Sequence, residues 1–317
     1  MRPTPIQKRK QYRTIYELLF ENPRIFAKTI SLTLGVNRNA TSNRMKEAFE
    51  MGIVFKPQLR RRAYFNFLEY VYFLNCKNPH RMFSSYIEDR TIAYHAQMSG
   101  FANLLIISNT EIDSKNSVLE GLRSDYHVSF APDHSWDRTI EIMQEKINLF
   151  ETKEYIPRNI LQTRWDETIK WNSEYEKLFR IFKYDLRQTF TPVRKETLIS
   201  SGKIYEWLRS LNECCTVFTL YYPKMISNYD NYLFMFETNY EDFVIDLFSE
   251  LPTSTTFFKV SGRLFAFTHV ERQYVRAYDF CKPKELQIPL LIDDLIERGI
   301  VKSEEHALIE CYWRKEI

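Results

Sequence analysis

Two glycines early in the chain, Gly35 and Gly52, mark positions where helices are expected to end. Each follows a stretch in which apolar residues recur at helical spacing, and glycine readily adopts the left-handed conformation found after the last turn of a helix. Asn37 is a suitable N-cap for the third of these helices. The predicted helices cover residues 8–21, 25–34 and 38–51. Three short helices separated by tight turns are typical of a helix-turn-helix, and this pattern constrains the N-terminal fold.

Two short apolar runs follow the third helix, at residues 53–55 and 63–65. They predict the two strands of a hairpin whose loop carries three consecutive arginines. A hairpin placed after three helices makes the predicted N-terminal domain, residues 1–67, a winged helix-turn-helix.

The segment over residues 68–135 changes to short apolar runs separated by turns. The expected elements are a strand at 70–74, a helix at 79–87, strands at 92–98 and 104–107, a helix at 117–122 and a strand at 126–130. This βαββαβ order is that of a ferredoxin-like domain.

The second half of the chain repeats this order of elements. Residues 136–166 are expected to form a helix and a linker. A second, divergent winged helix-turn-helix is expected over 167–225, and a second ferredoxin-like domain over 226–317. The predicted fold class is therefore α+β, with a duplicated pair of winged helix-turn-helix and ferredoxin-like (βαββαβ) domains.

The charge of the chain is unevenly distributed, although the net charge is only +3. Residues 1–68 hold 14 Lys and Arg against 4 Asp and Glu, whereas the remainder holds 30 against 37. This asymmetry indicates an N-terminal module that binds a polyanion and a body with another task.

The motif search gives no indication of an enzyme, a metal site or a cofactor. The five cysteines form no CxxC pair, which favours reduced thiols, and the six histidines have no metal-binding spacing. No phosphate-binding loop or nucleophile motif occurs, and no apolar run is long enough to cross a membrane. We therefore expect a cytoplasmic protein that is not an enzyme and does not contact a membrane.

The stretch over residues 15–65 resembles the leucine-responsive regulator/AsnC family of transcription factors. The residues that carry the resemblance are Asn22-Pro23-Arg24, Leu34-Gly35-Val36-Asn37, Arg44 and Met51-Gly52-Ile53-Val54. The resemblance implies a DNA-binding regulator, and residues 69–130 are similar to the effector-binding domain of that family. Gly100 matches the glycine near the family's small-molecule site, which makes Gly100, Phe101 and Asn103 candidate effector-binding residues. Asn103 stands where the family commonly has an acidic residue.

The third predicted helix offers side chains that can contact base edges in the major groove. Arginine pairs with guanine, and asparagine pairs with adenine. The loop arginines are placed for phosphate or minor-groove contact, and Arg44 for a phosphate or structural contact. The candidate DNA-binding residues are Arg38, Asn39, Ser42, Asn43, Arg44, Lys46, Arg60, Arg61 and Arg62.

The sequence thus predicts a transcriptional regulator with double-stranded DNA as its partner. A small-molecule effector is a further possible ligand. The chain is expected to form either a homodimer or an intrachain pseudo-dimer of its two halves. Two alternatives stay open, a non-specific architectural or chromatin DNA-binding protein and an RNA- or small-molecule-binding module. A steep decrease of DNA affinity with rising salt would separate the two kinds of DNA-binding protein from the RNA- or small-molecule-binding module.

Overall fold

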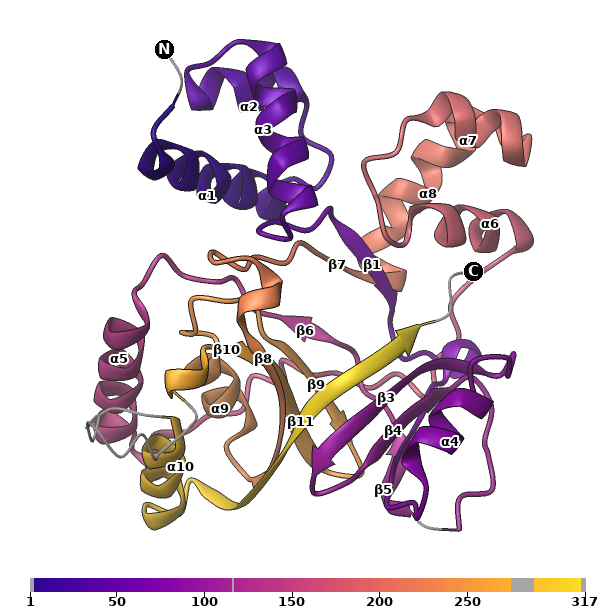
Figure 1. Ribbon diagram of the computed structural model, residues 1–317. Helices are drawn as coiled ribbons and strands as arrows, with labels where there is room; N and C mark the ends of the chain where they lie inside the picture. Colours follow the sequence, from indigo (N-terminus) through magenta and orange to yellow (C-terminus); the bar gives the residue numbers. More distant parts are fainter. Residues whose placement is uncertain (1–2, 116, 275–287, 315–317) are drawn as a thin grey trace. The chain divides into compact units, whose positions relative to one another are not determined.

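The computed structural model describes residues 3–115, 117–274 and 288–314 (Figure 1). The chain forms two compact units, each drawn from both halves of the sequence. The first unit contains residues 1–62 and 169–228, and the second contains residues 63–168 and 229–317. The sequence predicted five consecutive segments instead. Within the described residues, no helix is long and apolar enough to cross a membrane.

The first unit begins with three helices at the predicted positions. They are α1 (Pro5–Glu21), α2 (Ala27–Leu34) and α3 (Arg38–Glu50). Thr4 and Gln7 cap the start of α1 by exchanging hydrogen bonds between side chain and backbone, and the Asn37 side chain accepts from the backbone N–H of Ala40 at 2.8 Å. Gly35 ends α2 with a φ of 63°, a left-handed conformation that favours glycine. These caps confirm the predicted helices to within three residues at each end.

A second set of three helices completes the first unit. It comprises α6 (Ser173–Phe182), α7 (Phe190–Thr197) and α8 (Ser201–Cys214). Their facing sides bury a cluster of apolar residues around Trp207 and Phe182, whose rings lie 5.6 Å apart between centroids. The apolar residues that recur at helical spacing in these helices are the ones that pack inward.

The predicted hairpin after α3 is wrong. Instead, β1 (Gln58–Arg61) pairs antiparallel with β7 (Cys215–Phe218), which follows α8. The run at 53–55 also bonds to the second half of the chain, where the N–H of Tyr222 donates to the carbonyl of Ile53 at 2.8 Å. Local patterning suggested a strand partner nearby, but the actual partner lies more than 150 residues away in the sequence.

The second unit is built on a nine-stranded antiparallel sheet with the order β5-β2-β4-β3-β11-β8-β10-β9-β6. In the first half these strands are β2 (Tyr70–Leu74), β3 (Ile92–Gly100), β4 (Leu104–Ser108), β5 (Ser117–Leu122) and β6 (His127–Val128). In the second half they are β8 (Asp230–Thr238), β9 (Thr256–Val260), β10 (Arg263–Val270) and β11 (Val301–Arg314). The long strand β11 joins the halves, because it pairs with β3 on one side and β8 on the other.

The sheet curls so that its two ends approach each other. Phe73 of β2 stacks on Phe265 of β10 at 4.7 Å, and Phe258 of β9 stacks on the other side of Phe265 at 5.1 Å. Near the ends, the N–H of Ser124 donates to the carbonyl of Lys259 at 3.0 Å. Strands far apart in the sheet order therefore share one buried apolar core on the inner face.

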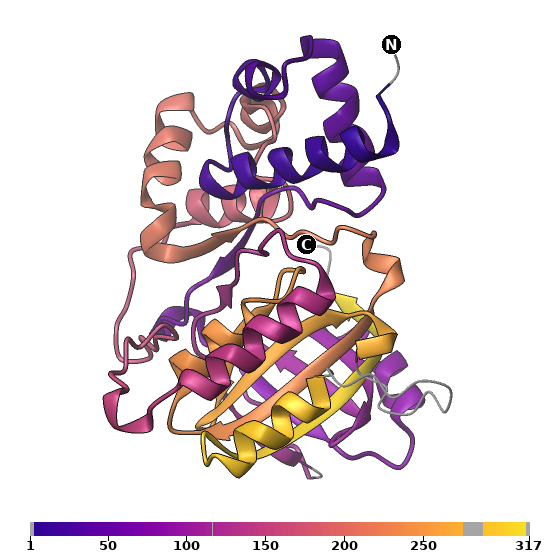
Figure 2. The same cartoon turned by 90° about the vertical axis from the view of Figure 1, so that its left-hand side faces the viewer.

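Helices cover the outer face of this sheet. Helices α5 (Trp136–Leu149) and α10 (Ile288–Glu297) lie side by side, as Figure 2 shows, and α5 also contacts α9 (Glu241–Phe248). The short helix α4 (Pro79–Ser85) contacts β3 at the other half of the sheet. Helices α4 and α5 lie where the sequence predicted helices, at 79–87 and within 136–166.

The predicted βαββαβ order over residues 68–135 is wrong in its second part. Residues 117–122 form strand β5 rather than a helix, with Leu119 opposite Phe73 of β2 and Val118 exposed. The short strand β6 pairs with β9 from the second half. Alternation of inward and outward residues identifies a strand. In a six-residue segment this alternation is difficult to distinguish from one face of a helix.

Candidate functional site

The residues predicted to contact DNA lie in two different environments. Arg38, Asn39, Ser42, Asn43 and Lys46 are exposed on α3. Arg44 is not, since its side chain is 12% exposed and donates to Gln11 at 2.8 Å and to Glu47. The guanidinium of Arg44 also lies over the ring of Tyr12, at 5.6 Å from its centroid. Arg44 therefore ties α3 to α1, in agreement with the structural role considered for it.

The three loop arginines are half-buried on and beside strand β1. Arg61 forms an ion pair with Glu176 at 2.6 Å and lies over the ring of Phe179 at 4.3 Å. Arg60 lies over the ring of Phe218 at 5.6 Å, and the N–H of Arg62 donates to the carbonyl of Cys214 at 3.0 Å. These arginines therefore pack within the first unit and do not lie in the predicted hairpin loop.

The predicted effector turn is tightly integrated into the sheet. A Cβ at Gly100 would lie 2.2 Å from the carbonyl oxygen of His306 in β11, so glycine is required by close approach of the two strands. Phe101 packs against the inner core. The Asn103 side chain bonds both the N–H and the carbonyl of Cys76, each at 2.8 Å. An effector role for this turn stays a prediction.

A surface pocket of about 320 Å³ lies in the second unit, where α5 ends and the following segment passes α9. A volume of this size is at the lower end of the range for small-molecule sites. The sequence placed this segment in a linker and missed the site. The available signal was a set of apolar and aromatic residues at the end of a predicted helix and in the linker after it: Leu149, Phe150, Tyr155 and Ile156.

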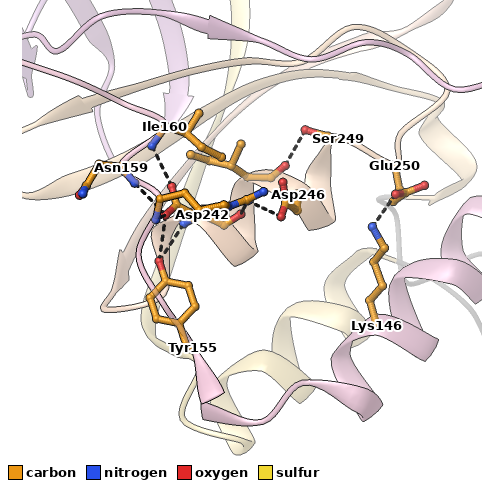
Figure 3. A network of polar contacts seen from close by, with 10 residues as sticks. Lys146, Tyr155, Asn159, Ile160, Asp242, Asp246, Ser249 and Glu250 are labelled. Carbon is orange, nitrogen blue, oxygen red and sulfur yellow. Dashed lines mark hydrogen bonds and ion pairs between the residues drawn. The ribbon is translucent and has the colours of Figure 1, made fainter. Parts of the chain in front are cut away.

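Asp242, at the start of α9, holds the segment that forms the pocket wall (Figure 3). Its carboxylate accepts hydrogen bonds from the consecutive backbone N–H groups of Arg158, Asn159 and Ile160, at 2.5, 3.1 and 3.0 Å. The hydroxyl of Tyr155 accepts from the backbone N–H of Asp242 at 3.3 Å. The positive φ of Asn159, 54°, turns these N–H groups toward one acceptor.

The charge of Asp242 is stabilised by this arrangement. Burial acts to raise the pKa of the carboxyl group, but the hydrogen bonds from Ile160, Arg158 and Asn159 outweigh it, and the pKa lies below its usual value. A carboxylate at the first turn of a helix is also favoured by the helix dipole. Asp242 therefore stays ionised and positions the wall of the pocket.

Aromatic rings form the floor of the pocket and the layer behind it. Phe150 and Phe243 stack with their centroids 3.9 Å apart, and Tyr155 and Tyr240 meet edge to face at 5.1 Å. Phe150, Tyr155 and Phe243 line the pocket itself. Ring faces carry partial negative charge, so a floor of this kind attracts cations as well as apolar groups.

Acidic residues predominate among the charged groups that line the pocket, which are Glu151, Glu154, Arg158, Asp242 and Asp246. Arg158 forms an ion pair with Asp246 at 2.5 Å. Among the residues that the structure describes, the carboxylates of Glu151 and Glu154 have neither an ion pair nor a hydrogen bond. The pocket therefore presents two free negative charges beside an aromatic floor.

No metal centre accounts for these acids. Within the described parts of the chain, no group of three or more His, Cys, Asp or Glu residues is arranged to hold a metal ion. The neighbouring ion pair between Lys146 of α5 and Glu250, at 2.5 Å, links α5 to the loop after α9 (Figure 3).

Two solved structures align with this chain over most of its length. No protein-family model and no curated protein matches the chain. The crystal structure of the siroheme decarboxylase NirDL has a TM-score of 0.48 and 10% sequence identity to it. NirDL in complex with an iron-uroporphyrin III analogue has a TM-score of 0.49 and 9% identity. In both cases the alignment covers 96% of this chain and 92% of the other. Likeness at this level assigns no activity to the chain.

This comparison corrects the functional predictions. The similar structures belong to an enzyme, one of them bound to an iron-uroporphyrin III analogue, and not to a regulator bound to DNA. The predictions of transcription regulation, of double-stranded DNA as partner and of a protein without enzymatic activity are therefore not retained. The resemblance to the leucine-responsive regulator/AsnC family holds only at the level of an α+β fold, since no family model matches.

Proposed function

We propose that the protein binds a small organic cation in the pocket between the segment after α5 and helix α9. The observation that carries the proposal is the combination of an aromatic floor, which contains Phe150 and Phe243, with the two unpaired carboxylates of Glu151 and Glu154. An amine or quaternary ammonium group over the rings gains a cation–π interaction, and the nearby carboxylates add electrostatic attraction.

The exposed apolar residues at the pocket's edge support a ligand with an apolar part. Leu149 and Ile156 are each 80% exposed although they line the pocket. Covering them with the carbon skeleton of a ligand removes apolar surface from water, at about 25 cal/mol per Å². A ligand that combines a hydrocarbon or aromatic body with one cationic group fits both features.

The charge balance of the pocket disfavours anionic ligands. Its lining has four acidic residues against the single cation Arg158, which is already paired with Asp246. A ligand carrying carboxylates or phosphates meets two uncompensated negative charges, and like charges at an interface reduce affinity.

A thermal-shift screen of the full-length protein tests this proposal. The probes are phenethylamine, its neutral analogue phenylethanol and its acidic analogue phenylacetate, with an iron porphyrin as a ligand of another class. We expect stabilisation by the amine alone, decreasing as salt rises because the carboxylates are exposed. Stabilisation by the porphyrin or by the acid, without any effect of the amine, would overturn the proposal.

Matched variants locate the binding. Glu151→Gln and Glu154→Gln are each expected to weaken amine binding by roughly 1.4- to 5-fold, the range measured for exposed ion pairs. Glu145→Gln is the control, because Glu145 is an exposed acid of the same helix region that pairs with Arg138 and does not line the pocket. Equal effects of all three changes would mean that the amine binds elsewhere.

A further inference from the structure

His95 is completely buried at the face of the sheet that α4 covers. It lies within β3 and is 0% exposed. Its ring meets Phe83 of α4 edge to face at 4.4 Å and stacks with Trp313 of β11 at 5.1 Å. Tyr86, just after α4, lies 6.1 Å away. Three aromatic side chains from two other elements therefore enclose one imidazole.

The imidazole has little polar support in this enclosure. Among the described residues, neither ring nitrogen of His95 makes a hydrogen bond of ordinary geometry, although the backbone of Phe83 lies close enough to act on the ring. Burial lowers the pKa of His95, and the backbone of Phe83 offsets this only in part. An uncharged imidazole can be accommodated here, whereas an imidazolium would lose its hydration with no compensating charge.

No neighbouring element supplies that charge. On the α4 side, the ring of Tyr86 lies near His95, and Cys76 acts on Tyr86; burial raises the pKa of both groups, so both are neutral. The carboxylate of Asp89, which also acts on Tyr86, accepts hydrogen bonds from the backbone N–H and the hydroxyl of Thr91 at 2.8 and 2.7 Å. On the β11 side, the carboxylate of Glu310 accepts a hydrogen bond from Gln97 at 2.7 Å. Protonation of His95 is therefore opposed from every side.

We propose that His95 is a pH-dependent latch, whose neutral ring holds α4 and the end of β11 against β3 and whose protonation releases them. The two elements are suited to local release. Helix α4 has only seven residues, none of them fully buried, and no side chain caps its start. Trp313 is only half-buried near the end of β11. Elements with few buried contacts open at a lower free energy than the whole fold.

The expected size of the effect follows from linkage. The closed form excludes the proton, whereas the open form takes it up with the ordinary histidine pKa of about 6.5. Stability is present above that pKa and is lost as the pH falls below it. Between pH 7.5 and pH 5.0 the opening equilibrium should increase by at most about 30-fold, the limit set by the uptake of one proton at the ordinary histidine pKa.

Hydrogen–deuterium exchange of the full-length protein at pH 7.5 and 5.0, corrected for the intrinsic exchange rates, tests the latch. Peptides covering residues 79–86 and 307–314 should lose protection at pH 5.0, while peptides covering β8 and β10 should not. His95→Phe fills the same space without a titrating group. In this variant, the protection of residues 79–86 and 307–314 should therefore not depend on pH. His80→Gln is the control, because His80 is exposed on α4 and its loss should leave the pH dependence intact.

Two outcomes would overturn the latch. One is wild-type protection over residues 79–86 that does not change between the two pH values. The other is a pH dependence that persists in His95→Phe. If His95→Phe does not fold, His95→Leu serves the same comparison, and the wild-type measurement stands without either variant.

Discussion

Replacing Asp242 by Asn tests whether this carboxylate supports the pocket wall. The wild-type group accepts three backbone N–H hydrogen bonds, from Arg158, Asn159 and Ile160. An amide offers one acceptor oxygen in place of two, and its NH₂ group faces N–H donors that it cannot satisfy. Since hydrogen bonds to charged groups contribute about 1.5–3 kcal/mol each, the change should lower the free energy of unfolding by about 2–4 kcal/mol.

Asp246→Asn is the matched control for this change. Asp246 is one turn further along α9 and pairs with Arg158, but both side chains are about half exposed. An exposed pair of this kind contributes about 0–1 kcal/mol. Both variants replace a carboxylate by an amide. Their comparison therefore separates the stability contributed by a buried hydrogen-bond acceptor from that contributed by a surface charge.

Urea unfolding followed by circular dichroism measures both variants. Because the pKa of Asp242 is lowered in the folded protein, the stability that it contributes is present above the unfolded value of about 3.9 and is lost as the pH falls through the folded value. The difference between wild type and Asp242→Asn should therefore be full at pH 7 and shrink below pH 4. Equal destabilisation by Asp242→Asn and Asp246→Asn at pH 7 would refute this reasoning.

Two further predictions concern the rest of the fold. Arg61→Met removes the ion pair with Glu176 and the stacking on Phe179; we expect a lower melting temperature and about 1–3 kcal/mol of lost stability, with unchanged amine binding at the pocket. A melting temperature equal to that of wild type would contradict a structural role for Arg61. Gly100→Ala places a Cβ 2.2 Å from the backbone of His306; denaturant unfolding should show a loss of about 1–3 kcal/mol, and an unchanged midpoint would argue against close approach of the strands.

Helices were predictable from the sequence because their ends carry local signals. Asn37 and Gly35 act within one turn of the chain, so the boundaries of α2 and α3 follow from neighbouring residues alone. Strands β9 and β10 were also predictable, because a Ser261-Gly262 turn separates two short runs rich in aromatic residues.

The errors arose where distant parts of the chain meet. Residues 53–55 and 58–61 bond to segments beyond residue 200, and β6 pairs with β9 rather than with a strand of its own half. Local patterning contains no information about such partners. The same limit explains the arginines predicted to lie in a basic loop: Arg60 and Arg61 pack on aromatic rings from the other half of the chain, and the N–H of Arg62 donates to the carbonyl of Cys214.

The pocket was missed for a related reason. Phe150 ends a predicted helix and Tyr155 lies in the segment after it, which has no clear periodicity. The pocket that they line depends on Phe243 and Asp242 of α9, about ninety residues later. The functional resemblance rested on the N-terminal helices, whereas the pocket lies in the other unit. Prediction of function from the first sixty-five residues therefore addressed a different part of the molecule.

The central claim, that the pocket selects an organic cation, is tested most directly by isothermal titration calorimetry with phenethylamine and phenylethanol. The measurement is the ratio of the two affinities in the wild type and in the double variant Glu151→Gln/Glu154→Gln. We expect the wild type to prefer the amine and the double variant to lose most of that preference while its affinity for the alcohol stays the same. An equal preference for the amine in both proteins, or none in the wild type, would contradict the claim.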